Sequence, residues 1–133
     1  MSKSFKKQFN PTFKSAVNIP RVGGEPLAVT FEFKTMDRLS LAKMFDRWKA
    51  DSIALLEQSV ERDKEGNPFT LTEWLELEIP MQVRQVKDIT VGWGFTDEFT
   101  DENIAELLGT GTSVTDVILE VYNDAFMRAR QGN

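Results

Sequence analysis

Residues 13–33 read FKSAVNIPRVGGEPLAVTFEF, and this stretch decides the fold class. Its two halves carry apolar side chains at even spacing, namely Phe13, Val17 and Ile19, then Leu27, Val29, Phe31 and Phe33. Even spacing places one face of each of two strands in a core. The glycines and prolines of residues 20–26 predict a loop between them, so the pair forms an antiparallel hairpin. Because an isolated hairpin is marginal in water, its apolar face is expected to pack on helices.

Residues 36–62 carry the pattern of a helix that follows the hairpin. Thr35 is its expected N-cap. The apolar positions with near-helical spacing are Leu41, Phe45, Trp48, Leu55, Leu56 and Val60. Two interpretations stay open, one continuous helix or two helices broken near Asp51-Ser52. Residues 63–68, DKEGNP, then predict a charged turn.

The pattern in residues 70–79 favours a helix over a strand, although Leu75, Leu77 and Ile79 also alternate. Pro80 is expected to separate this piece from a second helical stretch. That stretch leads to Trp93, and the glycines on either side of this tryptophan are expected to end it.

The final third has the clearest local signals. Thr100 is the expected N-cap of a short helix that stops at Gly109. Ser113 with Asp116 resembles a capping box at the start of a last helix. Its apolar stripe consists of Val114, Val117, Ile118, Val121, Ala125, Phe126 and Ala129. We therefore predict an α+β protein, a mostly helical single domain over residues 12–133 with an N-terminal β-hairpin packed on the helices, preceded by a mobile basic arm over residues 1–11.

Composition narrows the possible chemistry. The 133 residues are 41% hydrophobic and 28% charged, which is typical of a folded domain with one core. Cysteine and histidine are both absent, so disulfides, thiolate metal sites, cysteine nucleophiles and the commonest general base near neutral pH are excluded. A serine or threonine activated by lysine, or a pair of carboxylates, remains as a catalytic option. We expect a protein that is not an enzyme and needs no cofactor.

The acidic residues Asp97, Glu98, Asp101 and Glu102 form the one candidate catalytic or metal site. Stabilisation of a helix start by acidic side chains explains Asp101 and Glu102 without chemistry. Basic residues beyond the arm are interleaved with acids, so nucleic-acid binding is not expected. No apolar run approaches the roughly 20 residues that cross a bilayer, so no membrane partner is expected either.

Charge is distributed unevenly along the chain. Lys3, Lys6, Lys7, Lys14 and Arg21 precede the first acidic residue, Glu25, whereas residues 88–127 contain nine acids and no lysine or arginine. The asymmetry suits head-to-tail self-association through Lys3, Lys6 and Lys7 on one side and Asp97, Asp101 and Glu102 on the other. Two solvated faces of unlike charge explain the same pattern.

Five aromatic residues are candidates for protein binding. Phe5, Phe9 and Phe13 are spaced by four, but Pro11 interrupts any helix that would align them. The arm either carries a docking motif or lies on its own core. The turn around Trp93 and Phe95 is the second candidate.

The ordered features together resemble the tail assembly chaperones of long-tailed bacteriophages, over nearly the whole chain. The resemblance rests on the hairpin, on VKDITVGWGF at residues 86–95, on FTDENIAELL at residues 99–108, and on VILEVYNDAF at residues 117–126. Each part is a weak signal, and their order is the more specific one.

The resemblance implies a non-enzymatic protein that coats the apolar, helical tape measure protein, keeps it soluble and helps recruit tail tube subunits. Such a protein acts in the cytoplasm of the infected bacterial host, is absent from the mature virion, and often has a longer form made by ribosomal frameshifting. It would also form an open-ended homo-oligomer. Two alternatives stay open: a structural virion component, such as a head-tail connector or tail terminator, and a small hydrolase that uses the acidic cluster.

Overall fold

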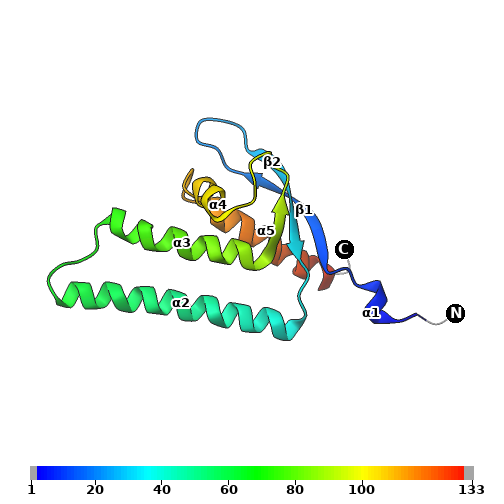
Figure 1. The fold of residues 1–133 in the computed structure, drawn as a ribbon, viewed down its shortest axis with the longest axis horizontal. Coiled ribbons are helices and arrows are strands. Elements are labelled where there is room, and N and C mark those ends of the chain that lie inside the picture. Colours follow the sequence, from blue (N-terminus) through cyan, green and yellow to red (C-terminus); the bar gives the residue numbers. More distant parts are fainter. Residues whose placement is uncertain (1–2, 131–133) are drawn as a thin grey trace.

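The computed structural model describes residues 3–130 and, within them, side chains as far as residue 127. Its elements are α1 (Phe5–Gln8), β1 (Thr12–Ile19), β2 (Leu27–Lys34), α2 (Arg38–Lys64), α3 (Leu71–Ile89), β3 (Thr90–Trp93), α4 (Asp101–Leu108) and α5 (Val114–Arg130). Helices predominate and the strands form one antiparallel sheet, which confirms the α+β class. Figure 1 shows α2 and α3 side by side as a long helical hairpin that extends past the sheet, with α1 at the opposite end of the molecule.

The predicted β-hairpin is present. β1 pairs with β2 in antiparallel register, with Val17 opposite Val29, and Gly23 in the connecting loop has a φ of 74°. Only glycine adopts this left-handed conformation without strain, which is why the loop closes there. The apolar face that the sequence predicted is buried at Val17 and at Phe31.

The sheet has a third strand that we did not predict. The helix ends at Ile89, and β3 pairs antiparallel with β2, with Trp93 opposite Phe31. The expectation that glycines end a helix running to Trp93 was therefore wrong. Thr90 and Val91 are β-branched and suit a strand, and the free edge of β2 supplies the hydrogen-bond partners that a sequence pattern cannot reveal.

Pro80 lies inside α3 and does not divide it, contrary to the prediction. A capping box at Thr70 and Glu73 begins the helix, and burial of Val83 and Val86 anchors its second half. Proline removes one backbone donor, and Pro80 is exposed and lines a hollow between α2 and α3.

α2 is one continuous helix of 27 residues, which resolves the alternative left open by the sequence. Thr35 is not its cap. The Asp37 carboxylate caps the helix by accepting the Ser40 N–H at 2.8 Å, while the Thr35 N–H donates to the Pro11 carbonyl. Of the residues in α2, only Met44 and Leu55 are buried.

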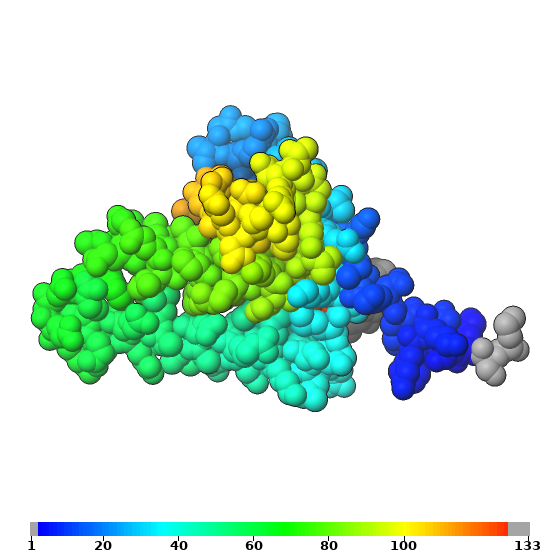
Figure 2. Space-filling model, in the orientation of Figure 1, coloured from blue at the N-terminus to red at the C-terminus, as the bar shows by residue number. Residues whose placement is uncertain are grey.

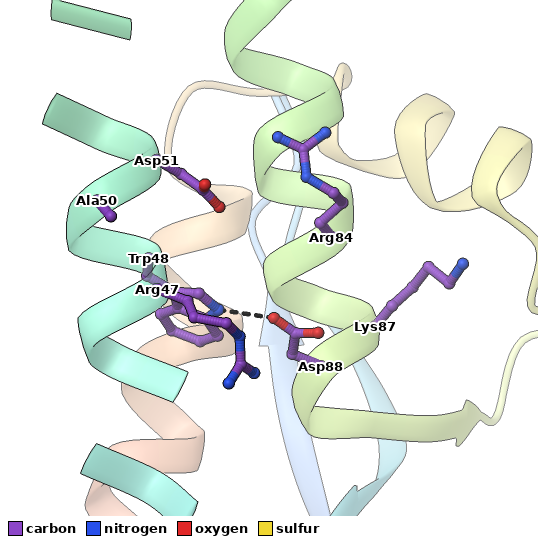
Figure 3. Close-up of a pocket in the computed structure, with 7 residues that line it drawn as sticks. All are labelled: Arg47, Trp48, Ala50, Asp51, Arg84, Lys87 and Asp88. Atoms are coloured by element: carbon purple, nitrogen blue, oxygen red, sulfur yellow. Dashed lines mark hydrogen bonds between the residues drawn. The ribbon is translucent and has the colours of Figure 1, made fainter. Parts of the chain in front are cut away.

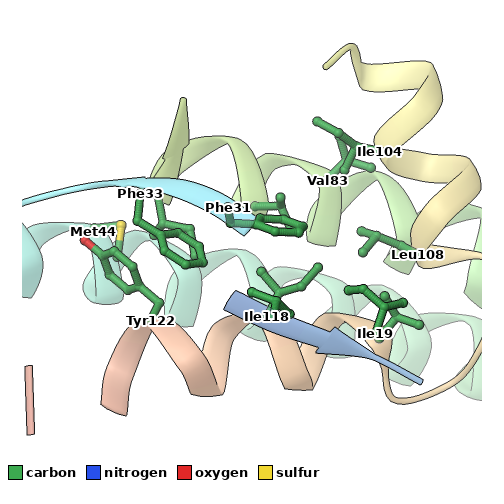
Figure 4. Packing of buried hydrophobic residues seen from close by; sticks show 13 residues of the cluster. Ile19, Phe31, Phe33, Met44, Val83, Ile104, Leu108, Ile118 and Tyr122 are labelled. Carbon is green, nitrogen blue, oxygen red and sulfur yellow. The ribbon is translucent and has the colours of Figure 1, made fainter. Parts of the chain in front are cut away.

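The core joins the strands to the helices (Figure 4). Its members are Val17, Ile19, Phe31, Phe33, Met44, Val83, Val86, Ile89, Ile104, Leu108, Val114, Ile118 and Tyr122. The predicted α4 is confirmed, because the Thr100 hydroxyl accepts the Asn103 N–H at 3.2 Å and the helix ends before Gly109. The last helix is also confirmed, and the Val117 N–H donates to the Ser113 carbonyl in its first turn.

Candidate protein-binding surfaces

The N-terminal arm exposes two of the predicted aromatic residues, Phe5 on the single helical turn α1 and Phe9 directly after it. Phe5 and Phe9 are 66% and 70% exposed, and their ring centroids lie 6.3 Å apart. Lys3, Lys6 and Lys7 are exposed beside them. Figure 2 shows the arm extending from the rest of the molecule. The arm thus presents a small aromatic pair surrounded by positive charge.

Phe13, the third of the set, lies in a different environment. Its ring packs 5.6 Å from Phe33, 6.0 Å from Tyr122 and 6.2 Å from Phe126, measured between centroids. These contacts join β1 to α5, so core packing accounts for the apolar character of Phe13. The exposed members of the predicted aromatic set are therefore Phe5 and Phe9.

Trp93 and Phe95 lie in an aromatic corner where β3 leaves the sheet. The Trp93 ring packs against Phe31, Phe95 and Phe99, with centroids 5.0 to 6.0 Å apart. Its indole N–H donates to the Asp97 carbonyl at 2.8 Å, which closes the turn. Both predicted residues remain partly exposed. They line a surface pocket of about 200 Å³ together with Asp97, Asn103, Glu106, Leu107 and Thr110.

Of the acidic residues near α4, Asp101 has its carboxylate paired, and Glu98 and Asp97 take part in local structure through their backbone carbonyls. Asp101 forms an ion pair of 2.7 Å with Lys87 of α3, and the Glu98 carbonyl accepts a hydrogen bond from the Asn103 side chain. Among residues 3–130, no group of three or more acidic residues is arranged to hold a metal ion. Asp97, Asp101 and Glu102 lie on α4 and the turn before it, separate from the lysines of the N-terminal arm.

The helical hairpin of α2 and α3 exposes a further apolar surface that we did not predict. The large apolar side chains exposed on it are Leu39, Phe45, Ile53, Leu56, Val60, Leu71, Leu75 and Leu77. The helical spacing of Phe45, Leu56 and Val60 did not predict which of these side chains are buried, and the structure leaves all three exposed. The distal half of the hairpin projects beyond the sheet (Figures 1 and 2), so side chains there that point away from the partner helix have no sheet to cover them.

Hollows between α2 and α3 are lined by charged side chains. A hollow of about 360 Å³ is lined by Arg47 and Asp51 of α2 and by Arg84, Lys87 and Asp88 of α3, and Figure 3 shows the Lys87 side chain extending away from α2. The Trp48 indole N–H crosses this gap and donates to the Asp88 carboxylate at 2.8 Å. Cations and carboxylates are mixed in the lining, as the interleaved charges of the sequence predicted.

A family model described as phage tail assembly chaperone matches residues 1–133, the whole chain. The chain belongs to the phage tail assembly chaperone family. No curated protein and no solved structure matches it. Membership confirms the resemblance seen in the sequence and connects the protein with the assembly of phage tails. A chaperone family suggests a non-enzymatic role.

The perturbed titratable groups of this tail assembly chaperone are explained by local structure. Burial raises the pKa of Tyr122 to about 12, and its hydroxyl donates to the Lys34 carbonyl. The backbone N–H of Ser40 lowers the pKa of Asp37, and that of Thr70 lowers the pKa of Glu73. Caps and core contacts, not a catalytic cleft, account for these shifts.

No helix in the part of the chaperone that the structure describes is both long and apolar enough to cross a membrane. Its exposed large apolar side chains lie mainly on the N-terminal arm and along α2 and α3, with others at Val22, Leu27, Val91 and Met127. The sequence contained a signal for the α2 surface, because Ile53, Leu56 and Val60 recur with spacings of three and four. We missed it because Leu55 lies beside Leu56, and periodicity alone does not show which of two adjacent stripes is buried.

Proposed function

We propose that this chain binds the tape measure protein during tail morphogenesis, keeps it soluble and helps recruit tail tube subunits. Family membership supports this role, because a tail assembly chaperone acts on other tail proteins. The observation that carries the proposal is the exposed Phe5–Phe9 pair, which lies outside the core and beside three lysines. Exposed aromatic residues surrounded by charge are typical of protein-binding surfaces.

The arm offers a mechanism for holding a helical partner. A long amphipathic helix that has not yet been packed into a tail exposes apolar stripes, and aromatic anchors bind such stripes with spacings of about one helical turn. Phe5 and Phe9 are the proposed anchors, and the pocket beside Trp93 and Phe95 is a second contact. The lysines of the arm would orient acidic segments of the partner.

Self-association extends the coat along the partner in this proposal. Lys3, Lys6 and Lys7 of one copy would contact Asp97, Asp101 and Glu102 of the next, which gives an open-ended, head-to-tail array. Because Asp101 already pairs with Lys87, the lysines would compete with that ion pair. The protein would do this in the cytoplasm of the infected host, and a longer frameshifted form would share the same domain.

The test is co-expression with a helical segment of the tape measure protein, measuring the soluble fraction of that segment. Replacing both Phe5 and Phe9 by serine is expected to reduce that fraction severalfold. The matched control is Val22→Ser, because Val22 is an apolar residue in the β1–β2 loop that is 93% exposed. Equal solubilisation by the double variant and by the control would refute the role of the arm.

A structural role in the virion predicts a different result. Mass spectrometry of purified phage particles is expected to find the tail tube protein and not this chain. Detection of the chain in stoichiometric amounts would favour the head-tail connector or tail terminator alternative instead.

A hydrolytic role for the acidic cluster is also testable. Asp97→Asn and Asp101→Asn each remove one carboxylate of the proposed head-to-tail contact, so each is expected to lower phage yield in part, while the native chain is expected to show no hydrolytic activity. A variant that folds normally but yields no phage, and that loses a hydrolytic activity shown by the native chain, would support the enzyme alternative.

A further inference from the structure

Five exposed residues of α2 form a single straight stripe. Lys49, Ile53, Leu56, Val60 and Asp63 are separated by four, three, four and three residues, a spacing that keeps side chains on one side of a helix. The three apolar members are 45%, 57% and 50% exposed. We call these five residues the α2 seam. It is an apolar centre with a cation at one end and a carboxylate at the other.

The seam lies on the side of α2 that faces away from α3. The three hollows along the helical hairpin are lined from α2 by Arg47, Trp48, Ala50, Asp51, Ala54, Leu55, Glu57, Gln58, Glu61 and Arg62. No seam residue is among them. Within residues 3–130, neither Lys49 nor Asp63 forms an ion pair. The seam therefore has no partner among the residues that the structure describes.

The order of the seam is self-complementary when a second copy runs antiparallel. The spacing reads four, three, four, three forwards and three, four, three, four backwards, so the two stripes interlock. Leu56 then meets Leu56 of the second copy, and Ile53 meets Val60 of the second copy. At both ends Lys49 faces Asp63 of the second copy, so both charges are matched.

We infer that the α2 seam pairs two copies of this chain through an antiparallel, two-fold contact. A parallel pair would place Lys49 against Lys49 and Asp63 against Asp63, and like charges across a helix interface favour the opposite orientation. A two-fold contact closes on itself and uses the same patch on both copies. Because the charges of the α2 seam complement those of a second, antiparallel seam, the proposed partner is a second copy of the chain.

The contact is short and its affinity is correspondingly low. Fourteen residue steps separate Lys49 from Asp63, which corresponds to about 21 Å of helix. Three apolar side chains per copy form a small interface, so a concentration-dependent dimer is expected and not a permanent one. The seam leaves α1 and the Trp93 corner uncovered, so a pair presents two arms to one long partner and binds it with avidity.

This pairing rests on the proposed self-association, and the seam contact would form first. Head-to-tail contacts between the arm and α4 would then join pairs into longer arrays. The two contacts use different residues, so each can be removed without the other.

Sedimentation equilibrium of the full chain over a wide concentration range tests the pairing. The native chain is expected to form monomers and dimers, and Leu56→Glu to weaken dimerisation roughly tenfold or more, because it places two like charges at the centre. Leu39→Glu is the matched control, since Leu39 is an exposed leucine of α2, 66% exposed, outside the seam. Circular dichroism of both variants checks that the fold is retained.

Charge exchange tests the orientation. Lys49→Asp and Asp63→Lys are each expected to weaken the dimer roughly fivefold, and the double variant to restore it, because the antiparallel pair again matches unlike charges. Failure of the double variant to recover, or equal dissociation by Leu39→Glu, would overturn the inference. So would a native chain that is monomeric throughout while Leu56→Glu loses tape measure solubilisation, which would assign the seam to that protein. The variant with both Phe5 and Phe9 replaced should dimerise normally. Loss of tape measure binding can therefore be distinguished from loss of dimerisation.

Discussion

The hydroxyl of Tyr122 donates a hydrogen bond of 2.8 Å to the backbone carbonyl of Lys34, which lies 88 residues earlier in the chain. This contact fastens α5 to the end of β2, next to the point where the chain leaves the sheet for α2. The ring of Tyr122 is fully buried and packs against Phe13, Phe33 and Phe126. The Tyr122 side chain therefore connects the C-terminal helix α5 with the N-terminal strands β1 and β2.

Replacing Tyr122 by phenylalanine should remove the hydrogen bond and keep the packing. The expected loss is about 1 kcal/mol in the free energy of unfolding, measured by urea denaturation. Tyr122→Ala should cost about 3–5 kcal/mol, because it also leaves a cavity in the core. Similar losses for the two variants would mean that the ring contributes little.

The same residue predicts a loss of stability in alkali. Burial raises the pKa of Tyr122 to about 12, above the value of about 10 for an unfolded chain. The unfolded state therefore releases its proton first, and stability is retained below pH about 10 and falls between pH about 10 and 12. Urea midpoints measured across this range should fall less steeply for Tyr122→Phe. Absorbance follows the titration directly, because Tyr122 is the only tyrosine.

Gly94 tests the pairing of β3 with β2. A Cβ at this position would lie 3.3 Å from the Thr30 carbonyl oxygen and 3.3 Å from a methyl group of Val29, and the Gly94 N–H donates to that carbonyl. Gly94→Ala is expected to cost about 1–3 kcal/mol, because the backbone must move apart. Gly92→Ala is the control, since nothing lies within 4 Å of its Cβ position. Equal urea midpoints for the two variants would contradict the close approach.

The Trp48–Asp88 hydrogen bond should hold α2 against α3. Only Met44 and Leu55 of α2 are buried, so polar contacts such as this one are expected to contribute to its attachment. Asp88→Ala is expected to cost about 1.5 kcal/mol and to accelerate amide exchange in α2 more than in the sheet. Asp88→Asn retains a hydrogen-bond acceptor and should lose less stability. Uniform acceleration over the whole chain would show that α2 does not open separately.

The capping box at the start of α3 predicts a local effect. The Thr70 hydroxyl accepts the Glu73 N–H at 3.1 Å, and the Glu73 carboxylate accepts the Thr70 N–H at 3.1 Å. Thr70→Ala should lower the free energy of unfolding by about 1 kcal/mol. Thr72→Ala, two residues further along and exposed, should change it little. Thermal or urea unfolding of the two variants is the comparison, and equal losses would argue against the cap.

Glu73 adds a pH dependence of defined sign. Its pKa is lowered chiefly by the Thr70 backbone N–H and then by Arg62. The folded state therefore binds the proton less readily, so the contribution is present above the ordinary pKa of glutamate and is lost as pH falls through the folded value. Glu73→Gln should therefore reduce the loss of stability on acidification, measured as urea midpoints at falling pH. An unchanged loss would mean that other carboxylates determine it.

Short-range signals predicted most of the elements. The alternation in residues 13–33 determined a hairpin with a buried face, and Thr100 determined the start of α4, because both depend on neighbours within a few residues. Pro80 and the glycines around Trp93 misled the prediction. Their local preferences were overridden by the cap and core contacts of α3 and by the open edge of β2.

The sequence by itself determined the α+β class, the absence of cysteine and histidine chemistry, and the phage tail assembly chaperone family, whose ordered motifs it contains. Only the tertiary structure decided which apolar residues are exposed. Phe13 packs against the core, because β1 lies against α5, while Leu56 stays in solvent, because it lies on the side of α2 that faces away from α3. Periodicity shows that an apolar stripe exists, but the elements packed around it determine whether it is buried.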